Sequence, residues 1–198
     1  NSFGVYPRSL SGLKGILFSP FIHGDIKHLY HNSAPLFVLL FSLLYFYRGI
    51  AWKVFIYGTL CTGLMTWVIA RKSYHIGASG IIYLLFSFIF FSGIIRKNYR
   101  LVAVSLMVIF LYGSMVWYLL PVKESVSWEG HLSGFISGLT MAFIYRGTGP
   151  QKFQYDWEKE DYEPDDFDTL FEEREENQST EPIPFKDYNL APLTNYFI

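Results

Sequence analysis

Five apolar segments, each close to the length of a membrane span, restrict most strongly what this chain can fold into. They cover roughly residues 32–47, 52–70, 76–95, 101–120 and 130–145. A helix needs about 20 residues to cross ~30 Å of hydrocarbon, and inside lipid its backbone groups must bond to one another. The pattern predicts an all-α polytopic membrane protein whose spans form a helical bundle.

The charges are distributed so unevenly that they divide the chain into parts. Residues 1–150 hold 12 Lys and Arg but 3 Asp and Glu, whereas residues 151–198 hold 4 and 14. We therefore expect three parts. They are an interfacial external segment over 1–31, a transmembrane core over 32–146, and an acidic, disordered tail over 147–198.

The positive charges between the segments predict which ends face the cytoplasm. Six Lys and Arg lie in the loops at 48–53 and 96–100 and at Arg146, against three in the loops at 71–75 and 121–129. The positive-inside rule places the first group and the tail in the cytoplasm. The sequence shows no eukaryotic targeting signal, so a bacterial cytoplasmic membrane is the expected location.

Ser79 is the first residue that could carry chemistry. It stands in the run GASGI, where a short polar stretch enters the third apolar segment, with Gly77 and Gly80 beside it. Small residues let membrane helices approach closely, which is one interpretation of the run. The other is a nucleophile at a helix N-terminus, where free N–H groups stabilise a developing oxyanion. The run is not the G-x-S-x-G elbow, which needs a preceding strand.

His131 favours the second interpretation. It lies at the start of the fifth segment, at about the depth of Ser79, and an ionisable residue within a span is costly. Alone, it could be a neutral histidine bonded between helices. Beside Ser79, its imidazole could act as a general base, and Tyr83, one turn after Ser79, could stack on it. Gly134, the middle glycine of a four-residue repeat, would let the two helices meet. No third, acidic member is evident, so a dyad fits better than a triad.

Two further polar residues open the first segment from the same side. His28 and Asn32 are four residues apart and would share one face of a helix. They could be ordinary interfacial groups or, beside a serine nucleophile, donors to an oxyanion. A metal site is the competing interpretation of the histidine-rich run HGDIKHLYH. Its spacing is not H-E-x-x-H, and a structural zinc would need further ligands, so we expect no metal and no cofactor.

Three stretches resemble the rhomboid family of intramembrane serine proteases: FIHGDIKHLYHN at 21–32, HIGASGIIY at 75–83 and GHLSGFISG at 130–138. They occur in the family's order and indicate a resemblance over roughly residues 3–146. The resemblance implies a rhomboid-like bundle that cleaves peptide bonds in or near transmembrane segments of membrane proteins. Such substrates and the lipid bilayer are the expected partners, and nucleic acid is not. Rhomboids have at least six spans, so the five seen here suggest a first helix missing before Asn1.

Carried over by motif, the resemblance implies a role for each candidate residue. Ser79 resembles the family nucleophile and His131 its base. His28 and Asn32 match the side-chain oxyanion donors, which the backbone N–H of Ser79 joins. Tyr83 matches the tyrosine that packs on the histidine. The supporting positions are Gly77, Gly80, Gly134 and His23, of which His23 matches a histidine with a structural role.

Two other functions are alternatives. One is a catalytically inactive relative that binds membrane clients, and the retention of both halves of a dyad argues against it. The other is a small transporter or channel, which would be expected to hold polar or charged groups near the membrane midplane. The polar residues here gather near one surface instead. An intramembrane serine endopeptidase, with its site open to the non-cytoplasmic side, is therefore the preferred interpretation.

Overall fold

The computed structural model describes residues 2–111, 117–124 and 126–150 of the chain. Most of this part lies in the long helices α2 (Ile26–Phe46), α3 (Ala51–Ile69), α4 (Ser79–Ile95), α5 (Tyr99–Leu111) and α6 (Trp128–Ile144). Short helical turns complete it: η1 (Leu10–Gly12), α1 (Gly15–Phe18), η2 (Ser19–Phe21) and η3 (Trp117–Leu119). An isolated antiparallel bridge pairs Val5 with His75. The predicted all-α fold is confirmed for the described residues.

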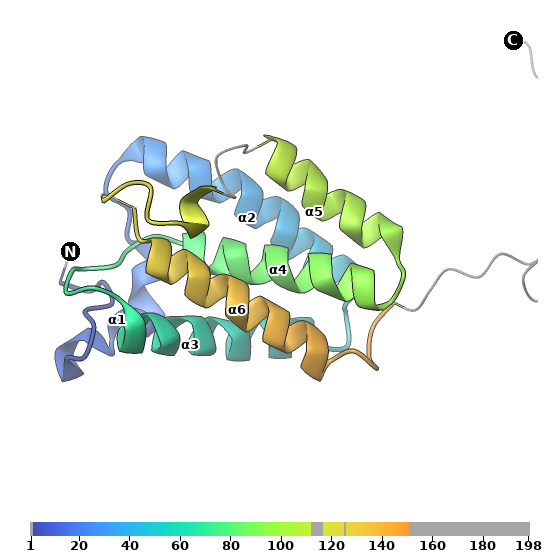
Figure 1. Ribbon diagram of the computed structural model, residues 1–198, viewed down its shortest axis with the longest axis horizontal. Coiled ribbons are helices and arrows are strands. Elements are labelled where there is room, and N and C mark those ends of the chain that lie inside the picture. The colour runs from blue at the N-terminus through green and yellow to red at the C-terminus, as the bar shows by residue number, and fades with distance from the viewer. Residues whose placement is uncertain (1, 112–116, 125, 151–198) are drawn as a thin grey trace, which may run out of the picture. The chain divides into compact units, whose positions relative to one another are not determined.

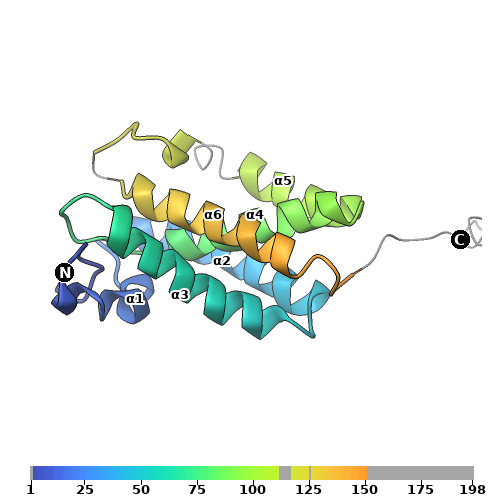
Figure 2. The same ribbon diagram turned by 60° about the horizontal axis from the view of Figure 1, so that its bottom comes forward.

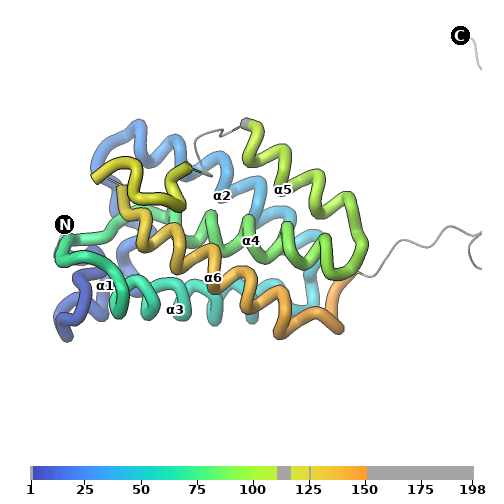
Figure 3. Tube along the Cα trace, in the orientation of Figure 1, coloured from blue at the N-terminus to red at the C-terminus, as the bar shows by residue number. Residues whose placement is uncertain are grey.

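The central helix of the bundle is α4 (Figure 1). It contacts α2, α3, α5 and α6, and 11 of its 17 residues are buried. Figure 1 shows α2 and α5 on one side of α4 and α3 and α6 on the other, and in the turned view of Figure 2 α5 lies above α4 while α2 and α3 lie below it. The tube trace shows that α2, α4 and α6 all begin at the same end of the bundle (Figure 3). Residues from three helices are thereby brought to one level.

The bundle exposes large apolar side chains, and its interior, built around an apolar core that includes Leu39, Leu43 and Phe88, also holds small polar ones. Phe37, Phe41 and Trp52 on α2 and α3 are 72%, 59% and 61% exposed. The buried hydroxyls include those of Ser87, Ser92, Ser105, Ser133 and Ser137. Such an arrangement suits a surrounding of hydrocarbon, in which small and hydroxylated residues join helices to one another.

The helices differ in how much of a bilayer they can cross. By length and composition, α2 with 21 residues and α3 with 19 are each long and apolar enough to span a membrane. The apolar helices α4 and α5 are shorter. The 17 residues of α4 reach about 26 Å at 1.5 Å per residue, against ~30 Å of hydrocarbon. The helix α4 is therefore shorter than the hydrocarbon layer is thick.

Several helix ends differ from the sequence expectation. The first span is expected from residue 32, but α2 begins at Ile26 because the carboxylate of Asp25 accepts the backbone N–H of His28 at 2.7 Å and caps the helix. Ser79 is expected three residues inside its span, but it is the first residue of α4. Gly77 stops the helix from starting earlier, since its φ of +100° is left-handed.

Two other expectations concern segments that the structure describes only in part. The fourth segment, expected over 101–120, is helical over Tyr99–Leu111, and residues 112–116 lie outside the description. The acidic tail expected over 147–198 lies outside it from residue 151 onward.

The backbones of α4 and α6 are in near contact. A Cβ placed on Gly134 would lie 2.1 Å from the carbonyl oxygen of Gly80, and one placed on Gly138 would lie 2.2 Å from that of Leu84. A side chain cannot be accommodated at either distance, so these positions require glycine. The glycine face of α6 therefore sets how closely that helix approaches α4.

Candidate active site

Ser79 and His131 meet at the end of the bundle where α4 and α6 begin. Ser79 is the first residue of α4, and His131 is the fourth residue of α6. The Oγ of Ser79 lies 2.9 Å from Nε2 of His131. The close approach at Gly134, almost one turn further along α6, lets the short serine side chain reach the buried imidazole.

The second nitrogen of His131 fixes which tautomer the ring adopts. Its Nδ1 lies 2.8 Å from the carbonyl oxygen of Tyr118. Because a carbonyl can only accept, Nδ1 carries the proton and Nε2 accepts the hydroxyl hydrogen of Ser79. The Tyr118 carbonyl thus occupies the place that a carboxylate takes in a Ser-His-Asp triad. The ring of Tyr83 stacks on the imidazole with centroids 4.3 Å apart and an interplanar angle of 19°.

His28 and Asn32 of α2 lie against the backbone at Gly77, two residues before Ser79. A Cβ on Gly77 would be 2.8 Å from Nε2 of His28 and 3.3 Å from Nδ2 of Asn32. Gly77 is therefore required for space as well as for its positive φ. The buried Nδ2 of Asn32 has no hydrogen-bond partner among the described residues. A free amide donor this close to the serine is available to a ligand oxygen.

His23 contacts His28 rather than the serine. The two rings meet edge to face with centroids 5.0 Å apart. Burial, and to a lesser degree the neighbouring His28, lowers the pKa of His23. Its ring is therefore neutral at neutral pH. In the part of the chain that the structure describes, no three His, Cys, Asp or Glu are grouped so as to hold a metal ion.

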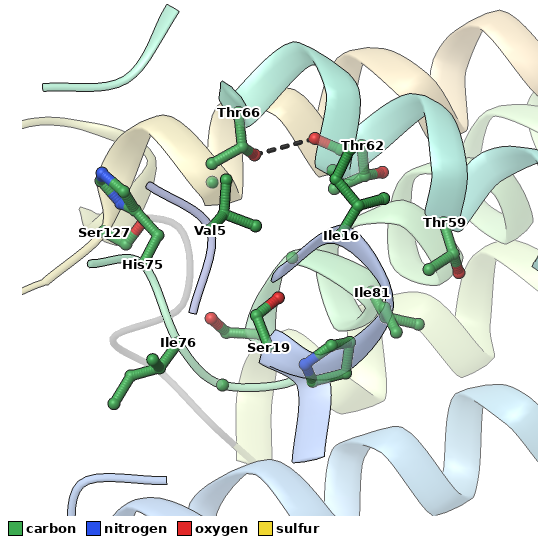
Figure 4. A pocket seen from close by; sticks show the side chains of 16 residues that line it. Val5, Ile16, Ser19, Thr59, Thr62, Thr66, His75, Ile76, Ile81 and Ser127 are labelled. Atoms are coloured by element: carbon green, nitrogen blue, oxygen red, sulfur yellow. Dashed lines mark hydrogen bonds between the residues drawn. The ribbon is translucent and has the colours of Figure 1, made fainter. Parts of the chain in front are cut away.

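A cavity of about 40 Å³, lined by both apolar and hydroxylated side chains, borders Ser79 on the side of α3 (Figure 4). Thr59 and Thr62 line it, and their hydroxyl oxygens are buried without a partner among the described residues. Further lining side chains are Ser19, Thr66, His75 and Ser127. One water molecule needs about 10–15 Å³ and two to four polar partners, so the cavity has room for about two or three. Water can be held within reach of Ser79.

Three contributors to the site are not among the residues expected from the sequence. One is the carbonyl of Tyr118, which is a backbone group and leaves no signal in residue identity. The others are His75 and Ser127, whose Nδ1 and Oγ lie 2.6 Å apart. From the sequence, His75 is noted only as the first residue of the stretch HIGASGIIY, without a role, and Ser127 is not noted. Their spacing could have indicated them, because His75 lies four residues before Ser79 and Ser127 lies four residues before His131.

The arrangement can perform acyl transfer. A serine hydroxyl that donates to a neutral imidazole can be deprotonated as it attacks a carbonyl carbon. The first two backbone N–H groups of α4, those of Ser79 and Gly80, have no carbonyl partner within the helix, while those of Ile81 and Ile82 donate to the Ala78 carbonyl. Asn32 adds its amide. The fold and the site together define a membrane-embedded helical bundle with a serine–histidine site near one end.

The comparison with protein families agrees with this class. The Rhomboid domain matches residues 11–148, and the chain belongs to the rhomboid family. This is a family of intramembrane proteases, and its members are integral membrane proteins.

The similar curated proteins are mycobacterial and uncharacterised. Proteins of Mycobacterium bovis and Mycobacterium tuberculosis are 36% identical to this chain over 152 residues, covering 71% of the chain and 62% of each relative. A protein of Mycobacterium leprae is 34% identical over 146 residues, covering 67% of the chain and 56% of the relative. The chain therefore spans at most 62% of the length of these relatives. No solved structure matches the chain.

Proposed function

We propose that this chain is an intramembrane serine endopeptidase that uses Ser79 and His131 as a catalytic dyad. The observation that carries the proposal is the 2.9 Å contact from Ser79 Oγ to His131 Nε2, made while Nδ1 of the same ring is bonded to the Tyr118 carbonyl. Membership of the rhomboid family supports the reaction class, and this contact supports the choice of residues.

Acylation follows from the tautomer of His131. The Oγ of Ser79 attacks the scissile carbonyl carbon while its proton passes to Nε2 of His131. Nδ1–H stays bonded to the Tyr118 carbonyl, so the imidazolium forms without rearrangement of the ring. The imidazolium then gives its proton to the leaving amine nitrogen as the C–N bond breaks. An ester between Ser79 and the N-terminal fragment of the substrate remains.

The negative charge that develops on the carbonyl oxygen needs donors. We assign this role to the side chains of His28 and Asn32 and to the backbone N–H of Ser79. Both side chains lie against Gly77, directly before the first turn of α4. Each donor of this kind typically contributes about 2.7–4 kcal/mol of transition-state stabilisation.

Deacylation needs water beside the ester, and the cavity lined by Thr59 and Thr62 has room for it. The unpartnered hydroxyls of these two residues can hold water molecules on the α3 side of Ser79. His131 takes a proton from the attacking water and returns it to Oγ of Ser79 as the ester bond breaks.

The substrate is a transmembrane segment that unwinds locally, because a hydrogen-bonded helix shields its carbonyls from attack. The site opens to the non-cytoplasmic side of a bacterial cytoplasmic membrane, where residues 1–31 lie at the interface. Residues 32–146 form the catalytic core, and the acidic part over 147–198 is cytoplasmic. The charge distribution between the helices supports this orientation.

The dyad is tested with the protein reconstituted in liposomes, a tagged transmembrane substrate and a fluorophosphonate probe for activated serines. Ser79→Ala and His131→Ala are each expected to abolish both cleavage and labelling. Ser73→Ala, which removes an exposed serine from the loop before α4, is the matched control and should behave as the parent does.

Three outcomes separate the possibilities. Cleavage that survives Ser79→Ala would contradict the assignment of the nucleophile. A well-folded parent that is neither labelled nor able to cleave would favour the client-binding alternative. Labelling of Ser79 without cleavage would support the dyad and show that the tested protein is not a substrate.

A further inference from the structure

A second serine–histidine pair lies beside the proposed dyad. Nε2 of His75 lies 3.0 Å from the carbonyl oxygen of Arg71, and its Nδ1 lies 2.6 Å from Oγ of Ser127. Because the carbonyl only accepts, Nε2 carries the proton, and Nδ1 accepts the hydroxyl hydrogen of Ser127. His75 is 5% exposed, and burial lowers its pKa, so the ring is neutral at neutral pH.

The two pairs join the same two segments of the chain. His75 lies four residues before Ser79, and Ser127 lies four residues before His131. One hydrogen bond therefore connects the segments at the dyad, and the other connects them in the loops that lead into α4 and α6. Figure 4 shows the side chains of His75 and Ser127 adjacent at one side of the cavity that Ser79 also lines.

The backbone around His75 is fixed independently of its side chain. The backbone N–H and carbonyl of His75 both bond to Val5, each at 2.9 Å. Because this backbone is held in place, the hydrogen bond between the His75 imidazole and Ser127 also fixes where Ser127 lies. The pair thus sets the distance between the loop before α4 and the loop before α6.

An ion pair holds the same loops together at a second point. Arg71 lies 3.6 Å from the carboxylate of Glu129, which is buried, with a side chain 4% exposed. The guanidinium also donates to the carbonyls of Glu124 and Val126, each at 2.7 Å. The loop that enters α6 is therefore bonded to the loop that enters α4 on both sides of Ser127.

On the helical side of the dyad, the packing of α4 on α6 sets the distance between the two backbones. The backbone contacts at Gly134 and Gly138 lie further along both helices than Ser79 and His131 do. They fix how close the helices are beyond the dyad, but by themselves they do not prevent the loop before Ser79 from moving relative to α6. The bond from His75 to Ser127 restrains that movement.

We propose that His75 and Ser127 are positioning residues that hold Ser79 at reacting distance from His131. This inference rests on the proposed function, because it concerns the geometry of that dyad. A misplacement of about 1 Å in an active site can lower the rate by about 100-fold. The loss of this bond should therefore slow the acylation of Ser79 while substrate binding is retained.

The test compares Ser127→Ala, His75→Gln and the double variant with the parent in liposomes. The measurements are kcat, KM, the rate at which the fluorophosphonate labels Ser79, and the thermal midpoint. Each single variant is expected to lower kcat and the labelling rate about 10- to 100-fold, with KM little changed. The double variant should be no slower than the slower single variant, because both changes remove one bond.

Two further variants separate positioning from general destabilisation. Ser127→Thr keeps the hydroxyl and should restore most of the labelling rate lost in Ser127→Ala. Ser133→Ala removes a buried hydroxyl from the same helix, where its bond to the Glu129 carbonyl stays within α6. It should label at the parental rate even if its thermal midpoint falls.

The outcomes distinguish this inference from the proposed function. If the parent is labelled and both Ser127→Ala and His75→Gln are labelled equally fast, the positioning role is overturned and the dyad stands. The positioning role would also be overturned if the losses in labelling rate of the two single variants added up in the double variant. A parent with no labelling and no cleavage overturns the dyad and the inference together. If His75→Gln does not fold, the comparison of Ser127→Ala with Ser127→Thr decides.

Discussion

Asn32 has a buried amide nitrogen that no described residue satisfies. Asn32 as a whole is 6% exposed. A buried donor without a partner costs about 1–3 kcal/mol, so this arrangement does not favour folding. The oxygen of a substrate carbonyl under attack by Ser79 would supply the missing acceptor.

Asn32→Ala is therefore expected to lower kcat by roughly 10²- to 10³-fold with little change in KM, since the proposed role of the amide is to stabilise the transition state. The thermal midpoint should stay the same or rise, because the unpaired buried donor is removed. Cleavage kinetics and thermal unfolding in the same liposomes check both expectations. Ser33→Ala is the control, since its exposed hydroxyl bonds to the Leu29 carbonyl of its own helix. An unchanged kcat with a lowered midpoint would show that Asn32 is structural.

At this scale, the sequence predicts side chains better than it predicts the groups that orient them. Ser79, His131 and Tyr83 could be picked out because helical spacing and depth place them on facing surfaces. Tyr118 could not, because its contribution is a carbonyl oxygen in a short 3-10 turn, η3, with no periodic pattern to place it. Which tautomer His131 adopts depends on that carbonyl.

At the scale of elements, the contact of α6 with α4 determines whether the dyad can form. The carbonyl oxygen of Gly80, one residue after the nucleophile, faces Gly134, three residues after the histidine. The closest approach of the two backbones is thus less than one turn from the reacting atoms. A change in this interface would therefore act on catalysis directly.

Gly134→Ala should separate the two helices, because a Cβ would lie 2.1 Å from the Gly80 carbonyl oxygen. We expect the variant to lose fluorophosphonate labelling of Ser79. Its free energy of unfolding should fall by about 1–3 kcal/mol, the usual cost of overpacking. Labelling and thermal unfolding measure the two effects. Gly147→Ala is the matched control, since no atom lies within 4 Å of a Cβ placed there. If Gly134→Ala were labelled at the parental rate, the dyad would not depend on this interface.

The existence of the long helices could be predicted from the sequence, but their ends could not. Hydropathy averaged over about 19 residues locates apolar segments and does not resolve where a helix starts. The start of α2 depends on one hydrogen bond, which the backbone N–H of His28 donates to the Asp25 carboxylate. The start of α4 depends on the positive φ of Gly77. Both are local backbone properties, and they decide that Ser79 is the first residue of its helix.

At the scale of the whole bundle, the two ends differ in chemistry. The acidic residues of the described part, Asp25, Glu124 and Glu129, lie in the loops or first turns at the end that carries Ser79. The Ser79 end also carries Arg8, Lys14, Lys27, Arg71, Lys72 and Lys123. The opposite end carries as many Lys and Arg but none of these acids: Arg48, Lys53, Arg96, Lys97, Arg100 and Arg146. There Arg96 donates to the carbonyls of Tyr145 and Thr148 and joins the ends of α4 and α6. The bundle is thus closed by different interactions at its two ends.

The fold class could be predicted because uninterrupted apolar segments of this length are compatible with few structures other than membrane helices. The arrangement of the helices could not. Most of the residues of α4 are buried, so its sequence is apolar on all sides and does not indicate which neighbour each face contacts. The glycine repeat on α6 was the exception, because it identified the face of that helix that meets another backbone.

The excess of Lys and Arg in the loops at 48–53 and 96–100 and at Arg146, over the loops at 71–75 and 121–129, predicts a fixed orientation that single cysteines can test. Cys61→Ala first removes the one native thiol. Lys72→Cys then adds an exposed thiol in the loop before Ser79, and Gly147→Cys adds one beyond α6. Because positive loops stay in the cytoplasm, a membrane-impermeant maleimide should label the Lys72→Cys variant in intact cells and the Gly147→Cys variant only after permeabilisation. The reverse pattern would place the Ser79 end in the cytoplasm and contradict the proposed orientation.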